Sequence, residues 1–232
     1  MKPWWLDERS HAGAEHLDER YVSGYDRKAG FDPTEDLDVL QRHGLASDSV
    51  VVDLGAGTGG FALAVAGLCR HVVAVDVSPA MTAAIRGRVT ELGLDNVSVV
   101  DGRFLSYEHH GQPADVIFTR NALHQLPDFW KAIALDRMAS MLRPGGILRL
   151  RDLVYDFAPA EADVRIEAWM SGAVTDPALG WTADELAEHV RGEFSTYSWV
   201  LDGMLDKTSF DIVDRTFRRS AYGTYTCKRR ST

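Results

Sequence analysis

A glycine-rich turn between a short apolar run and a helical pattern constrains the fold of this chain most. Residues Val50 to Leu54 are apolar except for Asp53, and they lead directly into Gly55-Ala56-Gly57-Thr58-Gly59-Gly60. The next stretch, Phe61 to Leu68, has the pattern of a packed helix. A strand, a glycine turn and a helix in this order allow a ligand to approach main-chain atoms that side chains would otherwise cover.

The same alternation of strand and helix patterns continues along the chain. Further strands are predicted at His71 to Asp76, Val97 to Val100, Asp115 to Thr119 and Ile147 to Leu153. Helices are predicted from the Ser78-Pro79 N-cap to about Leu92, and from Phe129 to Leu142. Apolar strands separated by helices predict βαβ units in a parallel sheet that is covered on both faces.

After the fifth strand the pattern becomes less regular. Ala160 to Met170 and Ala183 to Arg191 are predicted to be separate helices joined by a turn-rich segment, which we interpret as an inserted cap. A helix from about Tyr197 to Lys207 precedes two alternating strands, Phe210 to Arg218 and Tyr222 to Lys228. These strands should form an antiparallel pair at an edge of the sheet.

Composition narrows the classes of function. A chain of 232 residues fits one large domain, or one domain with a cap. The formal net charge is −9 and the acidic residues are dispersed, which argues against a nucleic-acid partner. Basic residues do gather near the C-terminus, where they form either a solvated edge or a local basic pocket. They are Arg215, Arg218, Arg219, Lys228, Arg229 and Arg230.

The other indicators favour a cytoplasmic protein without a metal. Only Cys69 and Cys227 are present, so no disulfide framework or cysteine metal cluster is expected, and a reducing compartment fits best. No apolar run approaches the 18 or so residues of a membrane span, and the N-terminus turns acidic early. His11 and His16 are spaced too loosely to predict a metal pair.

The glycine turn has two interpretations. Gly55-x-Gly57-x-x-Gly60, with Asp76 about 20 residues further on, matches the dinucleotide fingerprint and would indicate an NAD(P)-dependent oxidoreductase. However, Asp53 lies two residues before the first glycine, where its carboxylate would repel an anionic pyrophosphate. A cationic ligand suits this turn better, although the spacing leaves the oxidoreductase open.

Four motifs together resemble those of the class I S-adenosylmethionine-dependent methyltransferases. Asp53-Leu54-Gly55-Ala56-Gly57-Thr58-Gly59 is similar to that family's first motif. The strand-end acidic motifs are matched by Val73-Ala74-Val75-Asp76 and Val99-Val100-Asp101-Gly102, and the approach to the fifth strand by Leu142 to Leu148. The resemblance covers about Val50 to Leu153 in the right order.

The resemblance implies a fold and a cofactor. The fold would be a doubly wound, Rossmann-like, seven-stranded and mostly parallel sheet of order 3-2-1-4-5-7-6 with an antiparallel edge strand. The cofactor would be S-adenosylmethionine, with S-adenosylhomocysteine as product. We expect an N-terminal helical lid at 1–45, a cofactor-binding core at 46–154, a helical cap at 155–195, and a C-terminal helix and hairpin at 196–232 that complete the sheet.

The resemblance also implies roles for particular residues. Asp53 would hold the amino-acid end of the cofactor, Asp76 the ribose hydroxyls and Asp101 the adenine amino group. The structural alternative for the latter two is capping of the next helix. The expected cofactor-binding residues are Tyr21, Tyr25, Asp53, Gly55, Ala56, Gly57, Thr58, Gly59, Asp76, Val77, Met81, Asp101, Gly102, Arg103, Phe104, Arg120 and Asn121.

Tyr21 and Tyr25, four residues apart, share one face of a helix predicted within Leu17 to Phe31. They would either fold over the cofactor, where an aromatic face stabilises a sulfonium, or pack in the ordinary way.

In-line methyl transfer mainly requires alignment of the reacting groups. His124, directly after the fourth strand, is the leading candidate for a general base, with packing as its alternative. Asp152 and Tyr155, at the end of the fifth strand, are secondary candidates.

The acceptor is expected to be a small molecule. Four tryptophans lie in the N-terminal and cap regions, and they indicate either an apolar or aromatic acceptor pocket or ordinary core packing. They are Trp4, Trp5, Trp169 and Trp181. A protein that binds the cofactor without catalysis remains a third possibility.

Overall fold

The computed structural model describes residues 3–11 and 19–231, without the side chains of residues 19–21, 23 and 24. The side chain of Tyr21 and residue His16, both considered in the sequence analysis, therefore lie outside the described part. None of the helices in that part combines the length and apolar character needed to span a membrane.

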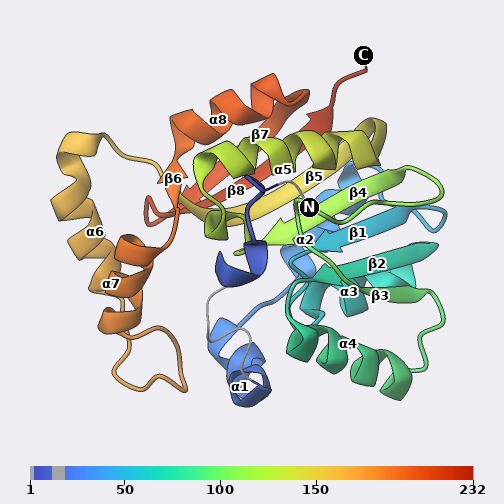
Figure 1. Cartoon of the computed structure of the whole chain (residues 1–232), viewed down its shortest axis with the longest axis horizontal. Helices are drawn as coiled ribbons and strands as arrows, with labels where there is room; N and C mark the ends of the chain where they lie inside the picture. Colours follow the sequence, from blue (N-terminus) through green and yellow to red (C-terminus); the bar gives the residue numbers. More distant parts are fainter. Residues whose placement is uncertain (1–2, 12–18, 232) are drawn as a thin grey trace.

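A mostly parallel sheet runs through the centre of the molecule (Figure 1). Its parallel strands are β1 (Val50–Leu54), β2 (His71–Asp76), β3 (Val97–Asp101), β4 (Ala114–Arg120) and β5 (Leu142–Tyr155). A hairpin of β7 (Phe210–Arg218) and β8 (Tyr222–Arg229) completes it, with β8 antiparallel to both β5 and β7. The order β3-β2-β1-β4-β5-β8-β7 confirms the predicted topology, because the last strand in the chain lies between the fifth strand and the edge.

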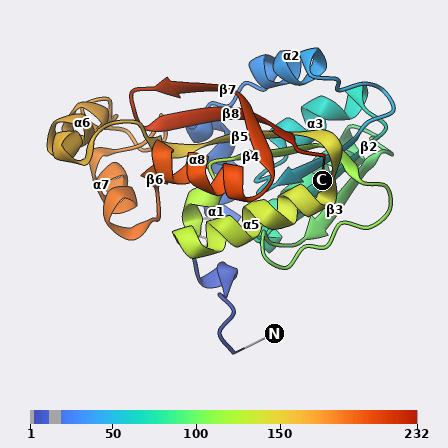
Figure 2. The same ribbon diagram turned by 90° about the horizontal axis from the view of Figure 1, so that it is seen from above.

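Helices cover both faces of the sheet (Figure 2). α2 (Thr34–Arg42), α3 (Gly60–Val65) and α4 (Pro79–Glu91) contribute Leu40, Phe61 and Ile85 to the core on one face. On the other face, α5 (Asp128–Met141) and α8 (Ser198–Lys207) belong to the core cluster that includes Val52 and Leu54 of β1. Neighbouring residues of β1 point to opposite faces, so every residue of this strand is buried.

A helical cap lies beyond one end of the sheet (Figures 1 and 2). It contains a short 3-10 turn η5 (Pro159–Glu161), α6 (Ala162–Met170) and α7 (Ala183–Gly192). Leu153 at the end of β5 packs with Trp169 of α6 and Leu186 of α7 in a small apolar cluster. The cap thus has its own apolar core, which begins at the end of β5.

The N-terminal region divides into separate parts. The 3-10 turn η1 (Glu8–His11) and α1 (Glu19–Ala29) lie near the carboxyl ends of the strands. By contrast, α2 packs against the sheet itself, where Asp36 accepts from Nε of Arg149 on β5 at 2.8 Å, both side chains being buried. The sequence pattern had not singled out α2, which contributes Leu40 to the core on one face of the sheet.

The observed elements differ from the expected ones mainly at their ends. The helix expected over Phe61 to Leu68 is α3 followed by a 3-10 turn, η3 (Ala66–Leu68). β5 begins at Leu142 instead of Ile147, because Ala114 of β4 pairs with Leu142 before a bulge. A short strand, β6 (Thr196–Tyr197), pairs with the end of β5 and was not predicted.

Candidate functional site

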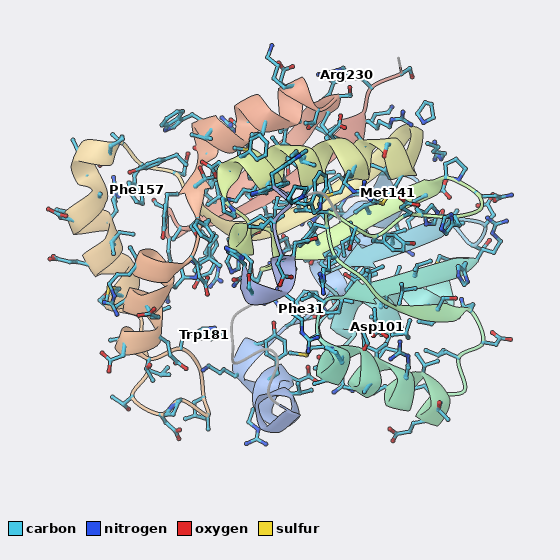
Figure 3. All side chains as sticks on the ribbon, viewed as in Figure 1. Phe31, Asp101, Met141, Phe157, Trp181 and Arg230 are labelled. Carbon is cyan, nitrogen blue, oxygen red and sulfur yellow. The ribbon has the colours of Figure 1, made fainter. Side chains whose placement is uncertain are left out.

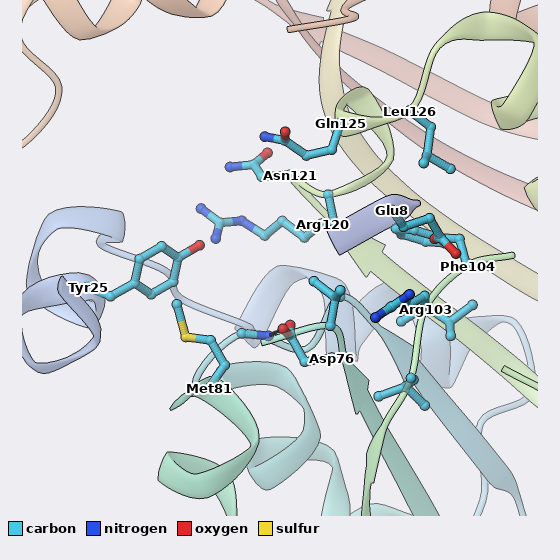
Figure 4. Close-up of a pocket in the computed structure, with 17 residues that line it drawn as sticks. Glu8, Tyr25, Asp76, Met81, Arg103, Phe104, Arg120, Asn121, Gln125 and Leu126 are labelled. Carbon is cyan, nitrogen blue, oxygen red and sulfur yellow. Dashed lines mark hydrogen bonds between the residues drawn. The ribbon is translucent and has the colours of Figure 1, made fainter. Parts of the chain in front are cut away.

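The glycine turn forms one wall of a cleft at the carboxyl ends of β1, β2 and β4. We call this cavity the glycine-loop cleft; its walls include Gly55, Gly57, Asp76, Arg103 and Asn121 (Figure 4). Gly55 has a φ of +75°, and a Cβ atom there would lie 2.5 Å from the Cβ of Ala122. Only glycine fits this position, since both the left-handed backbone and the close approach exclude a side chain.

Asp53 is buried beside the glycine turn and lines a cavity that continues from the cleft. Its Oδ2 atom has no hydrogen-bond partner among the described residues. Burial, and then the nearby Asp76 carboxylate, raise the pKa of Asp53 from 3.8 to about 8. A buried carboxylate with an unused oxygen is prepared to accept from a ligand, and most favourably from a cationic one.

Asp76, at the tip of β2, shapes the same cleft. Its two oxygens accept from the backbone N–H of Gly57 and of Ser78, each at 2.8 Å. Burial raises the pKa of Asp76 to about 6. Each carboxylate oxygen has a second lone pair, so Asp76 can still accept from a ligand hydroxyl. Val77, just before α4, and Met81 of α4 also line the cleft.

The far end of the cleft corrects one expectation. Gly102, Arg103 and Phe104 line it, but Asp101 does not. The Asp101 carboxylate accepts instead from Oγ1 of Thr82 and, at 3.2 Å, from Arg86, and it lies beside α4 (Figure 3).

A carboxyl group from the N-terminus occupies this end. Glu8 of η1 lines the cleft and accepts from the backbone N–H of Leu105 at 3.0 Å. Burial raises the pKa of Glu8 to about 7. This contact could not be predicted from the sequence, since Glu8 and Leu105 are 97 residues apart.

Helix α1 borders the opening of the cleft. Tyr25 lines it and lies 3.6 Å from the position that a Cβ on Gly57 would take. Asp26 accepts from the Thr58 hydroxyl of the glycine turn and pairs with Arg88 of α4. Thr58 is therefore part of the contact that fixes α1 over the turn, and Gly59 adopts a φ of +88° at the N-terminus of α3.

A second cavity, of about 400 Å³, adjoins the cleft beneath the cap. We call it the cap cavity. Arg120 and Asn121, at the end of β4, line both the glycine-loop cleft and the cap cavity. In Figure 4 the Arg120 guanidinium lies between Tyr25 and Asn121. Burial lowers the pKa of Arg120, whose described hydrogen bond is a 3.5 Å contact to the Ala29 carbonyl.

The walls of the cap cavity combine aromatic and cationic groups. The aromatic side chains are Trp169, Trp181, Phe217 and Tyr222. The cationic ones are Lys28, Arg120, Arg151, Arg218 and Arg219. Arg218 and Arg219 of the C-terminal basic group therefore line a pocket, although both residues are exposed. The two N-terminal tryptophans lie elsewhere, because Trp4 and Trp5 pack against Trp130 of α5.

The three candidate catalytic residues differ in their access to these cavities. Asp152 lines the cap cavity, whereas neither His124 nor Tyr155 is among the residues that form the walls of the cavities described above. His124 lies in the 3-10 turn η4 (Leu123–Gln125), where its Nδ1 contacts Asp152. Burial alone would lower the pKa of His124, but Asp152 and then Glu193 outweigh it and raise the pKa to about 9.

Two residues that follow His124 reach the cleft, although they were not among the expected cofactor-binding residues. Gln125 and Leu126 line the glycine-loop cleft, a few residues after the predicted Asn121. Their position just beyond β4 is the signal that could have included them.

Together, the doubly wound sheet and its carboxylate-flanked glycine cleft define a protein of the nucleoside-cofactor-binding α/β class. Comparison with known proteins specifies the family. A methyltransferase domain model matches residues 51–146. An uncharacterized methyltransferase of Schizosaccharomyces pombe is 38% identical over 102 residues, which span 43% of this chain and 37% of that protein.

Other relatives match over more of their length. An uncharacterized methyltransferase of Geobacillus kaustophilus is 26% identical over 83% of both chains. The crystal structure of an S-adenosylmethionine-dependent methyltransferase from Aquifex aeolicus superposes with a TM-score of 0.63 at 17% identity, covering 91% of this chain and 98% of that one. The domain match and the relatives support a class I S-adenosylmethionine-dependent methyltransferase, and the solved structure shows that the fold is shared. These matches favour a methyltransferase over the oxidoreductase that the glycine spacing left open.

Proposed function

We propose that this methyltransferase acts on a small-molecule acceptor that binds in the cap cavity. The observation that carries the proposal is the shared wall formed by Arg120 and Asn121, which joins the glycine-loop cleft to the cap cavity. A donor in the cleft and an acceptor in the cavity would meet at this wall. Such proximity alone contributes roughly 7–11 kcal/mol to a reaction between two bound molecules.

The residues of the cleft fit S-adenosylmethionine. We assign the ammonium group to Asp53, because its buried Oδ2 lacks a partner among the described residues, and the ribose hydroxyls to Asp76. Glu8, which lines the far end of the cleft, is a better candidate than Asp101 for the adenine amino group. When bound, S-adenosylmethionine supplies a methyl group on a positively charged sulfur, and no protein group has to activate it.

Tyr25 and the glycine turn would exclude water from the cleft. Tyr25 belongs to α1, which the Asp26–Thr58 contact holds over the turn. An aromatic face near a sulfonium contributes about 0.5–2 kcal/mol. We propose the same role for Tyr21, although its side chain lies outside the described part of the chain.

The cap, which we place at residues 155–195, would define the acceptor. The aromatic walls of Trp169, Trp181 and Tyr222 suit a flat apolar body, and Arg218 and Arg219 suit an anionic substituent. We therefore propose an aromatic acceptor that carries a carboxylate or similar anion.

Of the candidate catalytic residues, we assign only Asp152 to the wall of the acceptor site. If the acceptor loses a proton, His124 or Tyr155 would accept it only after movement of the cap, because neither residue lines the cavity. The structure thus favours transfer by alignment over transfer assisted by His124.

Release of S-adenosylhomocysteine tests the proposal. The purified protein is incubated with S-adenosylmethionine and matched pairs of acceptors, each a phenolic or amino-substituted aromatic carboxylate and its neutral methyl ester. We expect turnover with the carboxylates, at least tenfold lower kcat/KM with the esters, and reduction of that preference in Arg218→Gln. Tight cofactor binding with no turnover across the panel would instead favour a binding protein without catalysis.

A separate measurement of cofactor affinity controls this experiment. Titration calorimetry should detect binding of S-adenosylhomocysteine and none of NAD or NADP. Asp76→Ala should weaken binding by at least tenfold, since a charge-assisted hydrogen bond contributes about 1.5–3 kcal/mol. Glu35→Gln, which changes a cap-cavity residue outside the cleft, should leave that affinity unchanged.

A further inference from the structure

Two histidines and a glutamate converge where the cap meets the core. His124 belongs to η4, directly after β4, while His189 and Glu193 lie at the C-terminal end of α7. One ligand atom from each of these residues lies within 4.8 Å of the others. His124 is buried, and the other two are only partly accessible.

The ligand atoms face one another at close range. Oε2 of Glu193 lies 3.0 Å from Nε2 of His124 and also contacts Nδ1 of His189. This oxygen is inaccessible to solvent, yet neither contact has the alignment of a hydrogen bond. Lone pairs of the two imidazoles that point to a common centre would fit this arrangement.

The other nitrogen of each imidazole has its own partner. Nδ1 of His124 contacts the buried Asp152 carboxylate, and Nε2 of His189 lies 2.7 Å from the Ser195 hydroxyl. Histidine ligands of metals are held in this way, with a carboxylate or other polar group on the nitrogen that does not bind the ion. Asp152 thereby leaves Nε2 of His124 as the nitrogen that faces Glu193.

We propose that His124, His189 and Glu193 bind one divalent transition-metal ion, with Zn²⁺ as the best match. Two imidazoles and one carboxylate are a known ligand set for zinc, with bonds of about 2.0–2.2 Å. A divalent charge balances the carboxylates of Glu193 and Asp152 while both imidazoles stay neutral. The amide Nε2 of Gln125 lies 3.2 Å from Nε2 of His124, and a flip of this amide would place its oxygen there as a fourth ligand.

The ion would join the cap to the core. One ligand comes from η4 and two come from the end of α7, so the metal would fix α7 against the carboxyl end of β4. His189 also packs against Trp169, and both Trp169 and Asp152 line the cap cavity. Metal binding would therefore stabilise one wall of that cavity, independently of the reaction that takes place there.

Metal analysis and calorimetry test the site. The protein is treated with a chelator, dialysed and titrated with Zn²⁺, and Co²⁺ is bound in parallel for its visible absorption. We expect one equivalent of Zn²⁺, a Co²⁺ spectrum of tetrahedral or five-coordinate type, and at least a 100-fold loss of Zn²⁺ affinity in both His189→Gln and Glu193→Gln. The matched control is His110→Ala, which removes an exposed histidine elsewhere and should leave the affinity unchanged.

Binding of S-adenosylhomocysteine serves as a control for the correct folding of the variants. His189 and Glu193 do not line the glycine-loop cleft, so both variants should bind S-adenosylhomocysteine within twofold of the unmodified protein. The proposal is wrong if Zn²⁺ does not bind stoichiometrically, because the cluster is then an ion-pair network of imidazolium and carboxylate groups. The proposal is also wrong if the Zn²⁺ affinity is unchanged in both His189→Gln and Glu193→Gln, or if Zn²⁺ binding is lost in His110→Ala.

Discussion

The raised pKa of Asp53 predicts that cofactor affinity increases with pH. If Asp53 binds the ammonium group of the cofactor, only its ionised form does so, and burial raises its pKa to about 8. About 1% of the free protein would carry this charge at pH 6, and about half at pH 8. Because the apparent affinity scales with the fraction that is competent to bind, the Kd should fall about fiftyfold over this range.

Titration calorimetry with S-adenosylhomocysteine at pH 6, 7 and 8 measures this effect. Repeating the titration in buffers of different ionisation enthalpy should reveal uptake of a proton by the buffer at pH 7, because binding ionises Asp53. In Asp53→Asn the affinity should be nearly constant with pH and at least tenfold weaker at pH 8.

The effects of two other carboxyl groups of the cleft on the pH dependence of Kd have to be distinguished from the effect of Asp53. The pKa of Asp76 is raised only to about 6, below most of the range, but that of Glu8 is raised to about 7. Glu8→Gln should keep most of the pH dependence. A Kd that stays constant from pH 6 to 8, or a slope that persists in Asp53→Asn, would refute the assignment.

Three further predictions concern stability. Without cofactor, the stabilisation of Asp53→Asn relative to the unmodified protein should be about 2 kcal/mol larger at pH 8 than at pH 6. Above about pH 4 the folded Asp53 holds a proton that the unfolded chain releases, so the unmodified protein loses stability progressively until the pH reaches the folded pKa of about 8. Gly55→Ala should lower the melting temperature and abolish S-adenosylhomocysteine binding, and Ala122→Gly should restore part of the stability by removing the contacting methyl group. Asp36→Ala should cost about 3–5 kcal/mol in urea unfolding, because it leaves Arg149 buried without its main carboxylate partner.

Each stability prediction has a control. Gly67→Ala adds a methyl group in open space and should scarcely change the melting temperature. Glu161→Ala removes an exposed pair with Arg165 and should cost less than about 1 kcal/mol. If Asp36→Ala costs no more than Glu161→Ala, the buried pair does not stabilise α2 on the sheet. An equal pH dependence of stability in Asp53→Asn and the unmodified protein would contradict the first prediction.

The central strands could be predicted because their apolar runs are buried on both faces. β1 and β2 begin and end at the expected residues. Their order came from the resemblance to a family, since strand patterns alone do not say which strands pair. The short strand β6 escaped prediction because two residues, Thr196 and Tyr197, carry no periodic signal.

The site residues could be predicted where they lie at the ends of strands beside the glycine turn. Asp53 and Asp76 each end or nearly end a strand beside the glycine turn, so local sequence determines their position. Glu8 reaches the cleft only through tertiary packing of the N-terminal segment. His124 and Glu193 likewise come from distant segments, and no spacing in the sequence indicated that they meet.

Helix α1 contacts two neighbouring regions through two residues of a single helical turn. Its Asp26 contacts Thr58 of the glycine turn, and its Lys28 pairs with Glu185 of α7 in the cap. Opening the cleft by moving α1 must therefore break its hold on the cap as well. Kinetically, this coupling predicts an ordered mechanism, in which arrival of the donor secures the helix before the acceptor site reaches its final shape.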